Sequence, residues 1–313
     1  MAGIRSFHLG DRRYFKIAQI TDVHLTSFRN EGPEEPTLKL IEEIALAEKP
    51  DLFVCTGDLA WRHDTEPCIR EFARFMDEKK LYWTFAYGNH ERDYGPPTRV
   101  IDKILTESEY CIFDRGPDDI KGQSNYAVGI YNRNERLRFV LWMLDNCEYT
   151  EIRGRRTEAY IDSSQIDWFT EEKMRLCTEL GDGCRSLFFF HIPLMEFQEA
   201  LDAGVTIGNC GEPICCPEIN SGAFGAMKEM GDVLGVFVGH DHTNDFIADW
   251  HGIKLCYGRV TGYCDHRRGG YPANDAFERG ARIIILDQDN VNQFDTYLYI
   301  AGGKIIKQLE EVK

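Results

Sequence analysis

The stretch VLGVFVGHDHTNDF (residues 233–246) decides how the chain is interpreted. Its apolar run ends at Gly239, and His240 and His242 follow at once with Asp241 between them. A short apolar run bounded by glycine is typical of a buried strand. In open α/β sheets, ligands bind outside the carboxyl ends of the strands. The stretch therefore predicts a ligand-binding edge with imidazole groups.

Four more apolar runs of this kind occur along the chain, and each predicts a strand. They are YFKIAQI (14–20), DLFVC (51–55), LYWTFAY (81–87) and SLFFF (186–190). Apolar residues at helical spacing predict helices over 36–49, where Pro36 is placed to start the helix, and over 66–80. Strands that alternate with helices indicate right-handed βαβ crossovers and parallel pairing.

Further elements are predicted in the second half of the chain. A helix is expected over 163–180, with Ser163 or Ser164 as its N-cap. Residues 281–300 are expected to form two strands around a polar turn, which adds antiparallel strands to the sheet. The fold class that follows is α/β.

A metal-ligating residue type follows every one of the five runs. The segments are TDVH (21–24), TGDLAW (56–61), GNHE (88–91), HIPL (191–194) and GHDH (239–242). Each segment alone is more often a turn, but five in this order argue against chance. The candidate metal ligands are Asp22, His24, Asp58, Asn89, His191, His240 and His242. They are sufficient for two divalent ions, with Asp58 as the bridging carboxylate.

Local geometry supports this grouping. Residues two apart on an extended segment project to one side, so Asp22 and His24 are expected to point together, as are His240 and His242. The glycines at 57, 88 and 239 let the backbone turn sharply and come close to the site.

Composition bounds the class of protein. The chain has 313 residues, 43% of them hydrophobic, and no linker or repeat, so a single domain over 1–313 is expected. The 11 cysteines indicate a reducing compartment, and no signal peptide or run of roughly 18–20 apolar residues occurs, so a cytoplasmic protein without a membrane anchor is expected. The net charge of −16 excludes binding to nucleic-acid backbone or to an anionic membrane through a broad basic face.

Two groups of side chains, three cysteines and the arginines of one loop, allow more than one interpretation. Cys210, Cys215 and Cys216 lie in CGEPICC, where ordinary loop cysteines are favoured over a thiolate metal site because a second C-x-x-C pair is missing. The arginines of the 153–156 loop are favoured as solvated side chains over a site for a second phosphate.

The five segments make the sequence similar to the calcineurin-like metallophosphoesterase superfamily, whose pattern is D-x-H, G-D, G-N-H-[DE], H and G-H-x-H. INSGAF (219–224), LCYGRVTGY (255–263) and ERGARII (278–284) resemble its purple-acid-phosphatase-like branch. The resemblance implies a two-sheet β-sandwich of mixed strands flanked by helices, in four layers. Trp61 stands where purple enzymes have a metal-binding tyrosine, so iron-specific redox properties are not expected.

The same resemblance implies a division of the ligands. One ion would be held by Asp22, His24, Asp58 and His242, and the other by Asp58, Asn89, His191 and His240. It also implies that His90 is the proton donor or phosphate contact. Asn89, His90 and Tyr94 are the candidate substrate contacts, and Tyr126 and Tyr263 are further candidates for stacking on an aromatic group.

The leading hypothesis is a phosphoric monoester hydrolase, in which a hydroxide that bridges two ions attacks phosphorus in line and His90 protonates the leaving oxygen. The ligand set suits Mn²⁺, Zn²⁺ or Fe²⁺. A small phosphorylated molecule or a phosphoprotein is the expected substrate. The alternatives are a phosphodiesterase that acts on nucleotides or lipid headgroups, and a non-catalytic scaffold of the same fold.

Overall fold

Two sheets form the centre of the molecule in the computed structural model, which describes residues 4–26, 34–61, 65–93, 95–180, 183–263 and 277–310. The larger sheet runs in the order β1 (Arg5–His8), β5 (Tyr126–Tyr131), β6 (Leu137–Met143), β9 (Arg185–Phe189), β11 (Val233–Val238), β13 (Ile253–Tyr257), β12 (Ile247–Trp250) and β10 (Thr206–Ile207). The smaller sheet runs in the order β16 (Lys304–Ile306), β15 (Asn290–Ile300), β14 (Gly280–Asp287), β2 (Tyr14–Ile20), β3 (Leu52–Thr56) and β4 (Trp83–Ala86).

The two sheets pack face to face around a shared apolar core. Along β6, Phe139 and Leu141 belong to the core shared with the smaller sheet, whereas Val140 and Trp142 belong to a second core. Phe237 of β11 links the sheets directly, because its ring lies 5.4 Å from that of Phe294 on β15. Burial of both faces is what a central strand of a sandwich requires.

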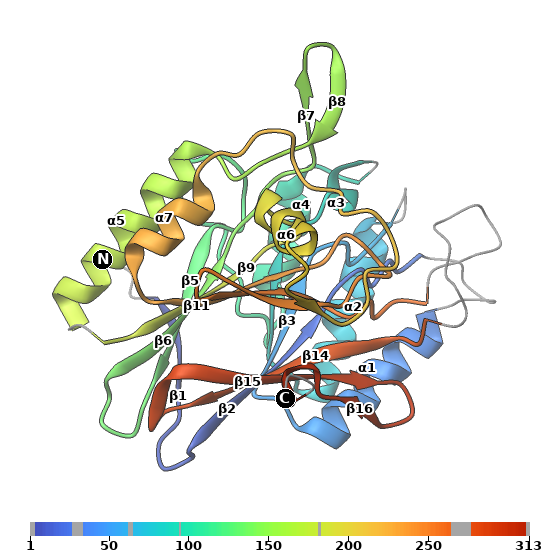
Figure 1. Cartoon of the computed structure of the whole chain (residues 1–313). Coiled ribbons are helices and arrows are strands. Elements are labelled where there is room, and N and C mark those ends of the chain that lie inside the picture. The colour runs from blue at the N-terminus through green and yellow to red at the C-terminus, as the bar shows by residue number, and fades with distance from the viewer. Residues whose placement is uncertain are drawn as a thin grey trace.

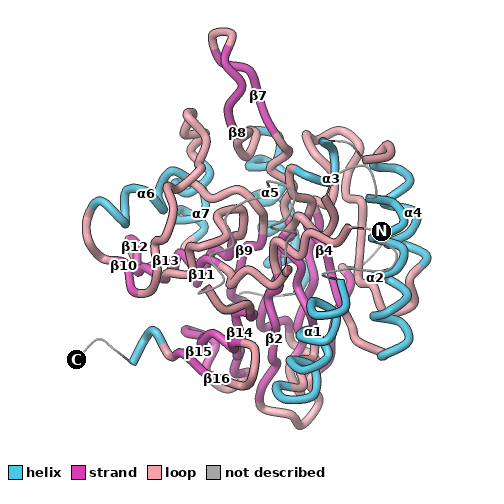
Figure 2. The backbone as a smooth tube through the Cα atoms, turned by 90° about the vertical axis from the view of Figure 1, so that its right-hand side faces the viewer, coloured by secondary structure: helices cyan, strands magenta, loops and turns pink. Residues whose placement is uncertain are grey.

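Helices cover the outer faces of the sandwich, as Figures 1 and 2 show. The helices are α1 (Glu34–Glu48), α2 (Thr65–Lys79), α3 (His90–Asp93), α4 (Thr98–Glu107), α5 (Ser163–Leu180), α6 (Met195–Asp202) and α7 (Ala223–Met230). Apolar residues of α5, α6 and α7 pack into the second core of the larger sheet. The expected two-sheet sandwich of mixed strands flanked by helices is confirmed.

The first part of the smaller sheet has the expected βαβ topology. Strand β2 pairs in parallel with β3, and β3 pairs in parallel with β4, while α1 and α2 connect them in the sequence. The predicted C-terminal strands are also present, since β14 and β15 pair antiparallel. Strand β14 pairs antiparallel with β2 and so joins them to the parallel strands. The expectation of one domain over 1–313 stays a prediction.

A separate hairpin stands out from the body of the molecule, at the top of Figure 1. It consists of β7 (Tyr149–Ile152) and β8 (Arg155–Glu158), which pair antiparallel. Arg153 and Gly154 form its turn with φ values of 52° and 76°. Positive φ at both central residues is the geometry of a type I′ turn, which matches the twist of a hairpin.

Among the described helices, none has the length and apolar character needed to span a bilayer.

The N-cap expected for α5 was wrong by one or two residues. Asp162 occupies that position, because its Oδ1 accepts a hydrogen bond from the Ser164 backbone N–H at 3.0 Å. Gln165 Oε1 in turn accepts one from the Asp162 backbone N–H at 2.8 Å. This arrangement resembles a capping box, with Asp162 as the N-cap directly before the helix and Gln165 at the third helical position.

The capping box predicts a difference between neighbouring positions. Replacing Asp162 with alanine removes the acceptor at the helix start, so the free energy of unfolding should fall by about 1 kcal/mol. Replacing the exposed Ser163 with alanine should change it little. Urea denaturation of both variants measures the difference, and equal losses at the two positions would contradict the assignment.

Candidate metal centre

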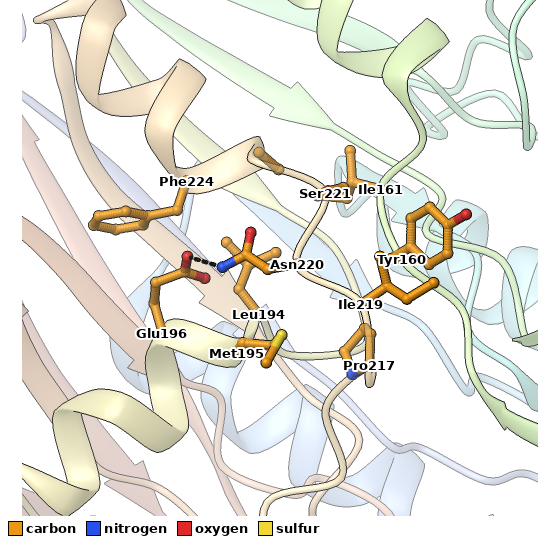
Figure 3. Close-up of a pocket in the computed structure, with 11 residues that line it drawn as sticks. Tyr160, Ile161, Leu194, Met195, Glu196, Pro217, Ile219, Asn220, Ser221 and Phe224 are labelled. Carbon is orange, nitrogen blue, oxygen red and sulfur yellow. Dashed lines mark hydrogen bonds between the residues drawn. The ribbon is translucent and has the colours of Figure 1, made fainter. Parts of the chain in front are cut away.

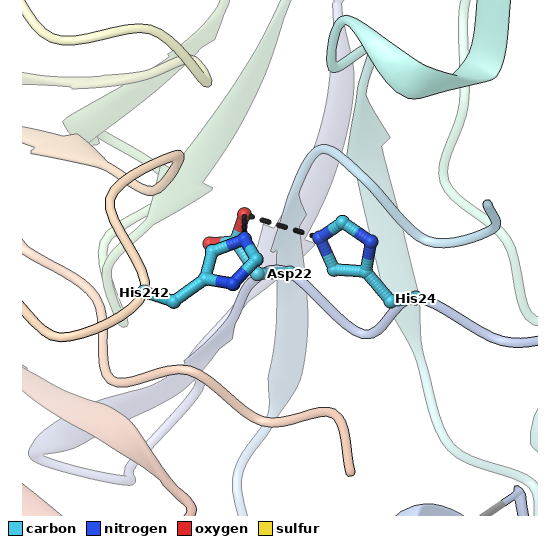
Figure 4. Close-up of side chains that lie close together, drawn as sticks. All are labelled: Asp22, His24 and His242. Atoms are coloured by element: carbon cyan, nitrogen blue, oxygen red, sulfur yellow. Dashed lines mark ion pairs between the residues drawn. The ribbon is translucent and has the colours of Figure 1, made fainter. Parts of the chain in front are cut away.

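The five segments that follow strands β2, β3, β4, β9 and β11 converge at one edge of the sandwich. One cluster of described residues joins Asp22, His24 and His242, whose ligand atoms lie within 4.8 Å of one another. Asp22 Oδ1 is 3.7 Å from His24 Nε2 and 3.4 Å from His242 Nε2 (Figure 4). The members of this cluster come from opposite halves of the sequence.

A second cluster joins Asp58, His191 and His240. Asp58 Oδ2 lies 3.1 Å from His191 Nε2, and His240 Nδ1 lies 3.3 Å from the same nitrogen. The two clusters touch, because the His240 backbone N–H donates to Asp22 Oδ2 at 3.1 Å. They coincide with the two ligand sets that the family resemblance implies, apart from Asn89 and the shared Asp58.

Asp58 lies between the two clusters. Its Oδ2 is 3.6 Å from His24 Nε2 as well as 3.1 Å from His191 Nε2. Its Oδ1 accepts the His90 backbone N–H at 2.9 Å. This position fits the bridging role expected for Asp58, which stays a prediction along with the other ligand roles.

The residues present fit metal ions. Three buried atoms, Asp22 Oδ1, His24 Nε2 and Asn89 Oδ1, have no hydrogen-bond partner within the described part of the chain. Buried polar atoms are nearly always hydrogen-bonded, so such a group needs an explanation. Imidazole nitrogens, carboxylates and an amide oxygen together suit borderline divalent ions such as Mn²⁺, Zn²⁺ or Fe²⁺.

Four of the expected ligands have left-handed backbone conformations. The φ values are 50° at Asp22, 49° at His24, 53° at Asp58 and 78° at His240. Side chains other than glycine rarely adopt this region, and such strain clusters at functional sites. The expectation that Asp22 and His24, or His240 and His242, converge along an extended segment was therefore wrong. Left-handed residues bring Asp22 and His24 together instead, whereas His240 and His242 join different clusters.

Close backbone approach explains two glycines beside these turns. A Cβ at Gly88 would collide with Asp58 Oδ1, and a Cβ at Gly239 would collide with Thr21 Oγ1. Both positions touch segments that carry a candidate ligand. The expected close approach at these glycines is therefore present in the structure.

The histidines have distinct electrostatic surroundings. Burial lowers the pKa of His24 to about 4 and that of His240 to about 3, so both imidazoles are neutral at pH 7. Burial also acts against the charged form of His191, but the Asp58 carboxylate outweighs it and raises the pKa of His191 to about 10. Metal binding at His191 would therefore release a proton.

The orientation of His191 is fixed by the backbone. Its Nδ1 donates to the carbonyl oxygen of Thr56 at 2.7 Å, which leaves Nε2 to face Asp58. A hydrogen bond at one ring nitrogen commonly fixes which nitrogen of a histidine binds metal. Around the carboxylates, burial favours protonation, but the histidines outweigh it and hold the pKa of Asp22 and of Asp58 below the usual range.

Glu91 is a buried residue whose role the sequence did not reveal. Its carboxylate accepts the backbone N–H groups of Asp58 at 3.1 Å, Leu59 at 2.7 Å and Gly88 at 2.8 Å. One side chain thus ties the segment of Asp58 to the segment that leads into Asn89. Burial, together with the charge of Asp58, raises the pKa of Glu91 to about 7. In the sequence, the position of Glu91 at the end of the GNHE segment was the feature that pointed to this site.

His90 and Trp61 lie beside the clusters. His90 Nε2 is 3.8 Å from Asp58 Oδ2, and its side chain is 23% exposed, more than that of His24 or His191. The Trp61 ring lies 5.6 Å from the His24 ring and 5.8 Å from the His90 ring. Trp61 thus lies beside the candidate ligands.

The roles of Asn89 and His90 as substrate contacts stay predictions, and the structure bears on two of the candidate tyrosines. Tyr126 was wrong as a stacking residue, because it is 4% exposed and its hydroxyl donates to the Phe85 carbonyl oxygen at 2.8 Å. Tyr263 is half-buried against the shared core. Tyr94 lies outside the described residues.

The arginines of the 153–156 loop have different surroundings. Arg155 pairs with Glu218 at 2.8 Å, and Arg153 is exposed in the hairpin turn. Arg156 stacks on Tyr149, with its guanidinium carbon 3.6 Å from the ring centroid. All three arginines are exposed, as expected, and Arg156 has the stacking contact in addition.

Cys215 lies near the second cluster, because its Sγ forms a group with His240 and Asp241. Burial raises the pKa of the Cys215 thiol to about 12, which disfavours a thiolate ligand. Cys210 is exposed and Cys216 is half-buried. These surroundings favour ordinary loop cysteines.

A pocket beside helix α6 lies outside these clusters. Figure 3 shows Leu194 and Glu196 at its wall, where Glu196 Oε1 accepts a hydrogen bond from Asn220 Nδ2 at 2.9 Å. The cavity volume is about 10 Å³. That space suits about one water molecule, so the pocket is too small for a substrate.

Comparisons with known proteins agree with this geometry. A family model described as calcineurin-like phosphoesterase matches residues 15–244. An Arabidopsis thaliana protein named "Probable inactive purple acid phosphatase 29" is 29% identical over 304 residues, which cover 87% of this chain and 77% of that protein.

Solved structures show the same fold. A dimetal phosphatase from Danio rerio superposes with a TM-score of 0.59 at 14% identity, over 95% of this chain and 99% of that chain. Purple acid phosphatase PPD1 from yellow lupin seeds superposes with a TM-score of 0.51 at 14% identity, over 94% of this chain and 53% of that chain.

Glu91 provides a test of how the site is supported. In Glu91→Gln, the amide N–H₂ must face backbone N–H donors, so at least one donor loses its acceptor. We expect the free energy of unfolding to fall by roughly 1–3 kcal/mol. Mn²⁺ affinity should fall about 10–100-fold, the usual effect of losing support behind a ligand.

The matched control is Glu109→Gln, which removes an exposed carboxylate outside the five ligand segments. Chemical denaturation and Mn²⁺ titration measure both quantities. Wild-type stability and affinity in Glu91→Gln would contradict the supporting role.

Proposed function

Because the chain belongs to the calcineurin-like phosphoesterase family, we propose that it is a phosphoric monoester hydrolase that depends on two divalent metal ions. The observation that carries the proposal is the position of Asp58 Oδ2, which lies within 3.1–3.8 Å of Nε2 atoms of His191, His24 and His90. Two ions there would supply Lewis acidity and lower the pKa of a water nucleophile.

The residues of the chain would divide the remaining work. Asn89 and the histidines would hold the ions, and Asp58 would keep them at a fixed separation. His90 would donate a proton to the leaving oxygen, since its imidazole borders the cluster and is partly exposed. A small phosphorylated molecule or a phosphoprotein is the proposed substrate.

A non-catalytic role is the second candidate, and one observation favours it. The Arabidopsis relative is named as probably inactive. In this chain, each candidate ligand position carries a residue type that binds metal, from Asp22 to His242. A site that had lost its function would have no chemical need for that set, which supports the hydrolase proposal.

A substrate panel tests the proposal. The protein loaded with Mn²⁺, Zn²⁺ or Fe²⁺ should hydrolyse phosphomonoesters, including a phosphopeptide, and lose the activity on addition of EDTA. Asp58→Asn should lose both activity and bound metal, because Asp58 is the residue proposed to contact both ions. Metal content by elemental analysis and folding by circular dichroism accompany the assay.

The other outcomes distinguish the alternatives. Two bound ions without turnover of any ester would indicate the non-catalytic role. Hydrolysis of phosphodiesters or cyclic nucleotides alone would indicate a phosphodiesterase. Normal turnover and metal content in Asp58→Asn would remove the bridge from the proposal.

His90 gives a second prediction. In His90→Ala, kcat should fall roughly 10²–10⁴-fold, the usual range for loss of a general acid. The loss should shrink for leaving groups of low pKa, because they need no proton. Bound metal should stay at the wild-type amount, since His90 is proposed to contact the substrate and not the ions.

The control is Trp61→Phe, which keeps an aromatic ring beside His90 and should retain activity. Loss of one metal ion in His90→Ala would make His90 a ligand. Equal losses on good and poor leaving groups would exclude the acid role.

A further inference from the structure

The side-chain amide of Asn89 has two ends with different surroundings. Its Nδ2 donates to the hydroxyl of Tyr149 at 3.1 Å. Its Oδ1 has no hydrogen-bond partner among the described residues, and Asn89 is 1% exposed. The two ends of an amide are nearly equal in shape, so hydrogen bonding decides which one faces a given direction. The present orientation leaves the oxygen for a cation.

Tyr149 is held in place from its other side. It is the first residue of β7, and Arg156 of β8 stacks on its ring with the guanidinium carbon 3.6 Å from the centroid. A cation over an aromatic face at this distance is a stabilising contact. The protruding hairpin in Figure 1 therefore supports a side chain that contacts a candidate metal ligand.

The base of the hairpin is anchored beside another candidate ligand. Asn146 Nδ2 donates to the Ile192 carbonyl oxygen at 2.6 Å, and the Ile192 N–H donates to Asn146 Oδ1 at 3.2 Å. Ile192 directly follows His191 in the sequence. The segment from Asn146 to Tyr149 thus contacts Ile192, next to His191, at one end and the side chain of Asn89 at the other.

We propose that Tyr149 is a positioning residue that orients the Asn89 amide so that Oδ1 faces the ion held by Asp58, His191 and His240. The proposal rests on the metal centre of the proposed function. Without the hydroxyl, Nδ2 becomes a buried donor with no acceptor in its present direction. Rotation of the amide would relieve that cost by turning Nδ2 toward the ion, where it cannot serve as a ligand.

Metal titration of Tyr149→Phe tests the proposal without any assay of activity. We expect the affinity for one Mn²⁺ to fall about 10–100-fold, while the other Mn²⁺ binds as in the wild type. Arg156→Gln should weaken the same ion by a smaller factor. Arg155→Gln is the matched control, because Arg155 pairs with Glu218 and not with the tyrosine. Its Mn²⁺ affinities should equal those of the wild type.

A double-mutant cycle separates amide orientation from a general structural role. In Asn89→Asp, both side-chain oxygens can bind an ion, so the group has no orientation to set. The loss caused by Tyr149→Phe should therefore shrink in the Asn89→Asp background. A loss of the same size in both backgrounds would overturn the proposal, as would unchanged affinity for both ions in Tyr149→Phe.

The two proposals fail in different ways. Wild-type protein that binds two Mn²⁺ ions and hydrolyses no ester would end the proposed hydrolase function. The titrations of Tyr149→Phe would still decide the positioning role. Conversely, an active enzyme with unchanged metal affinity in Tyr149→Phe would overturn the positioning role alone.

Discussion

Two buried carboxylates constrain the rest of the site. Asp22 and Asp58 are each 1% exposed, and transfer of an unpaired carboxylate out of water costs several kcal/mol. Imidazole nitrogens within 3.1–3.7 Å surround both groups and favour their ionised form. The histidines do not satisfy every carboxylate oxygen, because Asp22 Oδ1 has no hydrogen-bond partner among the described residues. Positive charge from metal ions would balance the arrangement.

The backbone carries a cost of its own to bring these groups together. Four candidate ligands have φ between 49° and 78°, and each such residue costs of order 1–3 kcal/mol. Pairing of β2 with β3 and of β3 with β4 fixes where the strands end, and the turns begin at those ends. Glu91 then holds two of the turns through backbone N–H groups. The sandwich thus stabilises a local geometry that the ligand segments would not adopt alone.

The sequence predicts the elements that position the site better than it predicts their supports. Apolar runs bounded by glycine or polar residues revealed the five strands whose ends carry ligands. Strands β5 (YAVGIY) and β6 (LRFVLWM) were not among the predicted strands, although each is a mainly apolar run. Tyr149 and Asn89 lie 60 positions apart, so no local pattern predicts their contact. Glu91 belongs to one of the predicted segments, but the sequence does not show its role. That role depends on backbone N–H donors of another segment, which only folding brings close.

The left-handed backbone of the candidate ligands also bears on whether the site still binds ions. A chain that no longer bound ions would gain stability by relaxing its left-handed residues and by replacing its buried carboxylates with apolar groups. This chain retains both features, which argues that ion binding is needed. His90 lies with His24 and Asp58 in a further group of possible ligands, but its side chain is more exposed than theirs. A partly exposed imidazole beside the buried candidate ligands is open to a bound substrate, and the proposed hydrolase would use it in that way.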